Sequence, residues 1–176
     1  MGKSSRQWTW LPILLVLVVS LILGSCNRKH TAQPFNPAEG TALDFWMELV
    51  SGPIYNASDA FGSVVLINFW DTWCGPCRYE QPDLNQLYTE FSDDGLEIIG
   101  ISLAHEGVPA VTAYLDEFNV EYTSGIIGPG VTDVHPYPVS IPHTLIIDRA
   151  GVIRHELTGS RSYETFAELI TPLLSE

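Results

Sequence analysis

The chain has 176 residues, 45% of them hydrophobic, and a formal net charge of −13. This length and this share of apolar residues suit one folded domain around one hydrophobic core. The excess of acidic residues argues against nucleic acid as a partner, because a phosphate backbone attracts lysine and arginine. We therefore expect a single acidic domain whose function does not involve nucleic acid.

Residues 1–25 have the pattern of an export signal. Lys3 and Arg6 precede an apolar run over residues 11–23, whose length suits a signal peptide and is short for a membrane span. The run ends in Leu-Gly-Ser-Cys at Cys26. This sequence resembles the lipobox at which bacterial lipoproteins are cleaved and acylated on the cysteine. The prediction is a lipoprotein signal peptide over 1–25 and lipidation of Cys26.

An uncleaved membrane anchor is the alternative for the N-terminal segment, with Trp8 and Trp10 at the membrane interface. Either arrangement tethers the protein to a membrane outside the cytoplasm. Residues 26–40 are polar and interrupted by proline and glycine, which predicts a flexible tether. Lipidation would also account for the odd count of three cysteines, because it leaves Cys74 and Cys77 as a pair.

The folded domain is predicted over residues 41–176. Its elements in chain order are a hairpin over 43–55, a helical turn over 58–61, a strand over 64–70, a helix over 75–92 kinked at Pro82, a strand over 96–103, a helix over 108–118, a glycine- and proline-rich stretch over 124–138, a hairpin over 143–148 and 152–157, and a helix over 163–174. Alternating strands and helices predict an α/β fold.

The segment Trp-Cys-Gly-Pro-Cys at residues 73–77 carries the chemistry. It follows a strand and opens a helix, so backbone N–H groups and the helix dipole would stabilise a thiolate at the first cysteine. Cys74 is therefore predicted to be the attacking nucleophile. Cys77, one turn into the helix, would close a disulfide with Cys74 or resolve a mixed one.

A zinc site is the alternative use of two cysteines. A closed zinc site needs four ligands, and the histidines are scattered without paired spacing. They are His30, His105, His135, His143 and His155. We expect no metal and no other cofactor.

Residues 68–82 contain Asn-Phe-Trp, Trp-Cys-Gly-Pro-Cys and Glu-Gln-Pro in succession. This combination resembles the thioredoxin superfamily, in particular the TlpA/ResA-like membrane-tethered reductases. The similarity extends over roughly residues 41–174, from an opening strand at 42–45 to a strand at 141–148. It implies a thioredoxin-like fold, with a central mixed β-sheet flanked by helices and an N-terminal β-hairpin extension.

The resemblance also assigns residues around the cysteines. It implies a cis peptide bond at Ile141–Pro142, which would lie against the disulfide and leave nearby backbone free to pair with an extended substrate. Glu80 shares a helix face with Cys77 and is a candidate proton shuttle, the alternative being a solvated charge. The candidates for substrate contact are Trp73, Gly75, Pro76 and Ile141, whereas Trp70 is expected in the core.

Three positions need separate interpretation. Asn68 stands where soluble thioredoxins have a buried acid, although it suits the tethered branch, and it cannot relay protons. Asp71 replaces a residue that is usually small, and a carboxylate there would raise the pKa of Cys74. His143 follows the expected cis-proline, where an exposed, inert histidine is favoured over a cation at the rim of the site.

The reaction these residues favour is dithiol–disulfide exchange. We expect a reductase of disulfides in exported proteins that receives electrons from a membrane electron donor. Among tethered relatives, reduction of apocytochrome c thiols before haem attachment is a common role.

Three alternatives remain open. A peroxiredoxin-like peroxidase shares this fold but has its cysteine in a Pro-x-x-x-Thr-x-x-Cys setting. A Sco-like copper-binding module has three residues between its cysteines instead of two. A redox-idle interaction domain would leave the cysteine pair unexplained.

Overall fold

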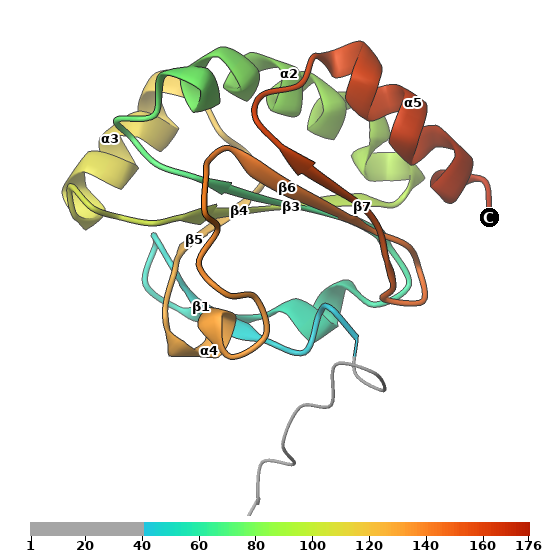
Figure 1. Cartoon of the computed structure of the whole chain (residues 1–176), viewed down its shortest axis with the longest axis horizontal. Coiled ribbons are helices and arrows are strands. Elements are labelled where there is room, and N and C mark those ends of the chain that lie inside the picture. The colour runs from blue at the N-terminus through green and yellow to red at the C-terminus, as the bar shows by residue number, and fades with distance from the viewer. Residues whose placement is uncertain (1–40) are drawn as a thin grey trace, which may run out of the picture. The chain divides into compact units, whose positions relative to one another are not determined.

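The computed structural model describes residues 41–176, and a seven-stranded mixed sheet runs through the centre of this domain (Figure 1). The proposed signal peptide, the tether over 26–40 and Cys26 lie outside the described residues. Within residues 41–176, no helix is both long and apolar enough to cross a membrane.

The sheet has the strand order β2-β1-β5-β4-β3-β6-β7. Strands β3, β4 and β5 are parallel to one another, and the other neighbours pair antiparallel. The strands are β1 (Trp46–Leu49), β2 (Ile54–Asn56), β3 (Val64–Trp70), β4 (Leu96–Ser102), β5 (Thr123–Ile126), β6 (His143–Ile147) and β7 (Ile153–Thr158). The helices are η1 (Ala57–Ala60), α2 (Gly75–Phe91), η2 (Ser92–Asp94), α3 (Val108–Phe118), α4 (Pro129–Thr132) and α5 (Tyr163–Leu174).

Strand β3 is buried along its whole length, because both faces of the sheet are covered. Val65 and Ile67 belong to the core beneath the sheet, together with residues from 42–60 and from α4 (Figure 1). Leu66 belongs to the core on the opposite face, with α2 and α5. Since side chains alternate along a strand, Asn68 and Trp70 lie on the α2 side. At the end of β3, Asn68 and Trp70 therefore face the start of α2.

Helix α2 begins immediately after Cys74, which is its N-cap residue. Pro76 lies in the first turn, where a missing N–H costs no helical hydrogen bond. The helix is assigned as one element through Pro82, and its buried face includes Leu84 and Leu87. The strand–turn–helix arrangement expected around the cysteines is thus present.

Strand β5 and helix α4 were not predicted from the sequence. β5 has the sequence Thr-Ser-Gly-Ile and is held between β1 and β4 by hydrogen bonds to both. Gly125 is needed there because a Cβ would lie 2.6 Å from Met47 Sδ and 2.7 Å from the Glu48 carbonyl oxygen. The strand is defined by its neighbours in space, which a local pattern of polar and small residues does not reveal.

His135 joins the loop after α4 to the N-terminal end of the domain. Its Nε2 lies 2.7 Å from the carbonyl oxygen of Ala42, and the edge of its ring meets the rings of Phe45 and Phe69. Burial lowers the pKa of His135 because the charged form loses its hydration, although the bond to Ala42 opposes this. The ring has a structural role below the sheet.

Candidate functional site

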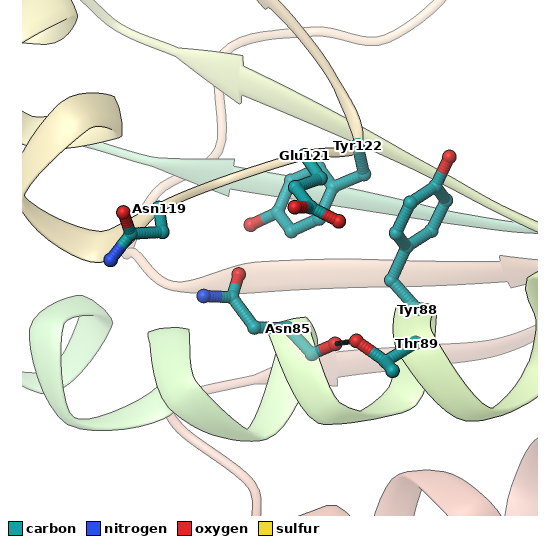
Figure 2. Close-up of a pocket in the computed structure, with 6 residues that line it drawn as sticks. All are labelled: Asn85, Tyr88, Thr89, Asn119, Glu121 and Tyr122. Atoms are coloured by element: carbon teal, nitrogen blue, oxygen red, sulfur yellow. Dashed lines mark hydrogen bonds between the residues drawn. The ribbon is translucent and has the colours of Figure 1, made fainter.

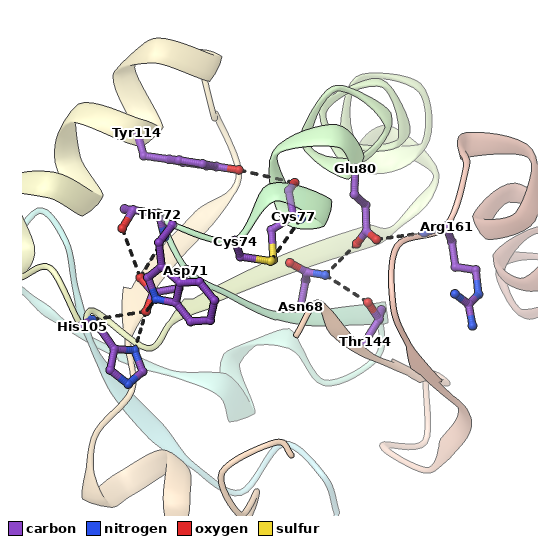
Figure 3. Close-up of a disulfide and its surroundings, with 11 residues drawn as sticks. Asn68, Asp71, Thr72, Cys74, Cys77, Glu80, His105, Tyr114, Thr144 and Arg161 are labelled. Carbon is purple, nitrogen blue, oxygen red and sulfur yellow. Dashed lines mark hydrogen bonds and ion pairs between the residues drawn. A yellow bond between two sulfur atoms is a disulfide. The ribbon is translucent and has the colours of Figure 1, made fainter. Parts of the chain in front are cut away.

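Cys74 and Cys77 form a disulfide at the start of α2, with the two sulfur atoms 2.04 Å apart. Both residues are almost completely buried, at 2% and 3% exposure. The backbone N–H of Cys77 donates to Cys74 Sγ at 3.2 Å (Figure 3). A thiolate at Cys74 would meet this donor and the positive end of the helix dipole, which lower a thiol pKa. The first sulfur is therefore the better placed nucleophile.

A groove of about 390 Å³ opens beside the disulfide. Its lining comes from the segment from Trp73 to Pro76, from Leu103 and from residues 138–141. The candidates for substrate contact, Trp73, Gly75, Pro76 and Ile141, thus line one groove with Cys74. Sequence reasoning missed Leu103 and residues 138–140, and this second group directly precedes Ile141.

The Ile141–Pro142 peptide bond is cis. Pro142 is buried, and its carbonyl oxygen already accepts a hydrogen bond from the Gly159 N–H at 2.8 Å. Within the described residues, no hydrogen bond uses the N–H or the carbonyl oxygen of Ile141. The backbone available to an extended partner is therefore that of Ile141, one residue before the proline.

Glu80 is buried next to the disulfide, at 1% exposure, so its interpretation as a solvated charge is wrong. Its carboxylate accepts hydrogen bonds from Asn68 Nδ2 and from the backbone N–H of Arg161, both at 2.9 Å. Asn68 Nδ2 also donates to Thr144 Oγ1 at 3.0 Å (Figure 3). Burial raises the pKa of Glu80 to about 7, against the lowering effect of these two donors. The acid can therefore exchange a proton near neutral pH.

Trp70 lies in the core, as predicted, at 2% exposure. Its ring is stacked on Tyr114 with the ring centroids 4.2 Å apart, and both belong to the cluster that contains the two cysteines. Trp70 Nε1 is the one buried side-chain polar atom without a hydrogen-bond partner in the described part of the chain. The disulfide thus lies against aromatic packing from β3 and α3.

His143 is not the exposed residue expected from the sequence, because 15% of its side chain is accessible. Its Nε2 lies 3.4 Å from Glu156 and its Nδ1 lies 3.3 Å from Thr158 Oγ1, both on the neighbouring strand β7. Strand pairing explains the burial, since His143 is opposite Thr158 in the register of β6 and β7. The ring is oriented by β7.

A second hollow, of about 230 Å³, lies between α2 and the segment that leads into β5 (Figure 2). Its lining residues are Asn85, Tyr88, Thr89, Asn119, Glu121 and Tyr122. No cysteine lines it. The amide of Asn85 is already engaged, because it donates to the Phe118 carbonyl and accepts from Gln81 Nε2. This hollow is separate from the disulfide.

The fold and the cysteine pair define the class of protein, and comparisons with known proteins define the family. The AhpC/TSA family model matches residues 39–156, so the chain belongs to this family. It is 30% identical to the thiol-disulfide oxidoreductase ResA of Halalkalibacterium halodurans over 98% of this chain and 99% of that protein. It is 32% identical to the thioredoxin-like protein YneN of Bacillus subtilis over 86% of this chain and 90% of that protein.

Solved structures agree with this assignment. A putative thiol:disulfide interchange protein DsbE from Chlorobium tepidum has a TM-score of 0.68 at 26% identity, covering 76% of this chain and 95% of its own. A thioredoxin family thiol:disulfide interchange protein from Chlorobium tepidum TLS has a TM-score of 0.71 at 26% identity. The match covers 81% of this chain and 98% of that chain. The expected thioredoxin-like fold is confirmed, and the chain is a protein-disulfide oxidoreductase of the ResA/DsbE type.

Proposed function

We propose that this protein reduces disulfides in exported proteins while tethered to the outer face of a membrane. The observation that carries the proposal is the position of the Cys74–Cys77 disulfide, which borders a groove next to the unpaired backbone of Ile141. An extended substrate segment could pair with that backbone and present its disulfide to Cys74. Trp73, 59% exposed at the edge of the groove, offers an apolar contact to the same segment.

The proposed exchange has two steps. The Cys74 thiolate attacks one sulfur of the substrate disulfide, which forms a mixed disulfide and releases the other substrate sulfur as a thiolate. Cys77 then loses its proton and attacks Cys74 Sγ, which releases the second substrate sulfur. Two electrons have passed to the substrate, and the Cys74–Cys77 disulfide seen in the structure is the oxidised product. A membrane electron donor returns two electrons to the pair.

Glu80 is proposed to take the proton from Cys77 in the second step. The acid lies one turn after Cys77 on the buried face of α2, and its pKa of about 7 suits both accepting and releasing a proton near neutral pH. Asn68 and the Arg161 N–H hold the carboxylate in place.

The direction of exchange is tested by the reduction potential of the cysteine pair. We expect the full-length protein, equilibrated with dithiothreitol or glutathione before its thiols are trapped, to give a potential near the roughly −270 mV of thioredoxin. The Gly-Pro pair between the cysteines is the one found in reducing thioredoxins. A potential near roughly −120 mV, typical of a strong oxidant, would require the reductase assignment to be dropped.

Membrane attachment is proposed through lipid on Cys26, after removal of a signal peptide over residues 1–25. The support is the basic start, the apolar run and the Leu-Gly-Ser-Cys sequence. We expect cells that express the protein to incorporate labelled palmitate into it, and Cys26→Ser to remove the label. Cys74→Ser is the matched control and should keep the label. Labelling that survives Cys26→Ser would contradict the proposal.

The substrates we propose are exported proteins with accessible disulfides, including the cysteine pair of apocytochrome c before haem attachment. A second candidate function, peroxide reduction, is raised by the match to the AhpC/TSA family. The peroxidase motif places threonine three residues and proline seven residues before its cysteine. This chain has Asp71 and Ile67 at those positions. Turnover of hydrogen peroxide faster than that of protein disulfides would favour the peroxidase.

A further inference from the structure

A fully buried carboxylate lies directly before the cysteine motif. Asp71 is the first residue after β3 and has 0% exposure. Burying a charge is costly unless the charge is paired and hydrogen-bonded, so the partners of Asp71 define what the residue does. The proposed redox chemistry assigns Asp71 no part.

Asp71 accepts hydrogen bonds from Thr72, Trp73 and His105, and Figure 3 labels Asp71 with Thr72 and His105. Oδ1 accepts from the Thr72 N–H at 2.8 Å. Oδ2 accepts from Trp73 Nε1 at 2.9 Å and from the His105 N–H at 3.3 Å, and it lies 2.5 Å from His105 Nδ1. Burial by itself raises the pKa of Asp71, but these donors outweigh it and hold the pKa below its usual range. The side chain is therefore a charged acceptor shared between two loops.

The two loops are both close to the groove. Trp73 lies on the loop between β3 and α2 and lines the groove beside Cys74. His105 lies on the loop between β4 and α3, two residues after Leu103, which lines the same groove. The rings of Trp73 and His105 meet edge to face, with centroids 6.2 Å apart. Asp71 is the acceptor that joins them.

Trp73 has little else to hold it in one orientation. Its side chain is 59% exposed, and in the described residues its indole N–H bonds only to Asp71. A side chain that is fixed before binding loses less conformational entropy when a partner docks on it. A small residue at position 71 would leave the indole free to rotate at the surface.

We propose that Asp71 is a positioning residue for substrate recognition, whose carboxylate fixes Trp73 and the His105 loop as a rigid wall of the groove. This proposal rests on the proposed function as a reductase of protein disulfides. Asp71 then strengthens the binding of extended protein substrates, because these are long enough to contact Trp73. Small disulfides, which need only Cys74, gain nothing from the fixed indole.

The test compares two disulfide substrates with the full-length protein: insulin, and bis(2-hydroxyethyl) disulfide as a small control. Asp71→Ala should raise KM for insulin about tenfold with kcat unchanged, because an ordered side chain at the binding wall is lost. Its kcat/KM with the small disulfide, which reports any change in the Cys74 thiol itself, should change much less than its kcat/KM with insulin. In a Trp73→Phe background, Asp71→Ala should raise KM less than it does in the wild type, because only the His105 loop remains to be released.

Two His105 variants give a matched comparison. Asn places its Nδ2 where the histidine has Nδ1, so His105→Asn should keep the bond to Asp71 and the wild-type KM for insulin. His105→Ala removes that bond and should raise KM. The Trp73 indole N–H resonance, assigned by its loss in Trp73→Phe, should lose its hydrogen-bonded downfield position in Asp71→Ala and keep it in His105→Asn.

Three results would overturn the inference. An unchanged KM for insulin in Asp71→Ala would show that the fixed indole does not matter for recognition. Equal losses with insulin and with the small disulfide would show that Asp71 supports the cysteine pair itself. A wild-type protein that reduces neither substrate would refute the proposed function and this inference together, which distinguishes that failure from the other two.

Discussion

Cys77→Ser is expected to convert the protein into a trap for its own substrates. Cys74 would still attack a substrate disulfide, but no thiol would remain within reach to release the mixed disulfide. Turnover should stop after one exchange, and a covalent adduct with insulin should accumulate. The adduct is measured on non-reducing gels with reduced full-length protein that also carries Cys26→Ser, so that Cys74 is its only thiol.

The matched control is Cys74→Ser in the same background, with Cys77 as the remaining thiol. Both cysteines are buried, but Cys77, unlike Cys74, does not line the groove, so this variant should form no adduct. Dithiothreitol should release insulin from the Cys77→Ser adduct and restore the free protein. Equal adduct yields from the two variants would contradict the assignment of Cys74 as nucleophile and Cys77 as resolving thiol.

Glu80→Gln is expected to lower the rate of the resolving step about a hundredfold, the usual order for losing a positioned acid–base group. Since Glu80 has a pKa of about 7 and acts as a base, the wild-type rate should rise as pH increases through 7. Gln has no such titration, so the variant should lose that inflection. Rapid-mixing experiments that trap thiols between pH 5 and pH 9 measure both effects.

Glu90→Gln is the control for this prediction, because Glu90 is an exposed acid on the same helix. It should keep both the wild-type rate and the inflection near pH 7. If Glu80→Gln also keeps the inflection, another group accepts the proton and the proposed role of Glu80 is wrong.

The contribution of Glu80 to the stability of the fold should fall over the pH range in which its contribution to the rate rises. Its pKa is raised from 4.5 to about 7 by burial, which corresponds to about 3 kcal/mol. The folded state therefore holds the proton more tightly than the unfolded state does. This stabilising contribution is fully present below pH 4.5 and is lost as pH rises through 7. The charge that serves catalysis thus weakens the fold at alkaline pH.

The strands and helices around the disulfide could be predicted because their signals are local. β3 is a continuous apolar run, and α5 repeats apolar residues at helical spacing with the same bounds as predicted. β5 could not be predicted, because four residues that include Gly125 become a strand only through bonds to β1 and β4. α4 is four residues long, too short to show a period.

The residues of the candidate site also differ in whether a local sequence signal predicts them. The sequence motif placed Cys74 and Trp73 directly, since five consecutive residues carry the signal. The burial of Glu80 depends on Asn68, 12 residues away, and on Arg161, 81 residues away. Asp71 was predicted to raise the pKa of Cys74, which stays a prediction. Its bond to His105, 34 residues further on, was invisible in the sequence.

The burial of the cysteine pair also limits which disulfides can oxidise the reduced protein. Cys74 is 2% exposed, and in the described part of the chain the groove is where it borders open space. Thiol–disulfide exchange requires the attacking sulfur to approach along the line of the target bond, so access sets the rate as much as driving force does. A bulky disulfide that cannot enter the groove would then oxidise the reduced protein only slowly. The selectivity of the protein would be kinetic, determined by which partners can enter the groove.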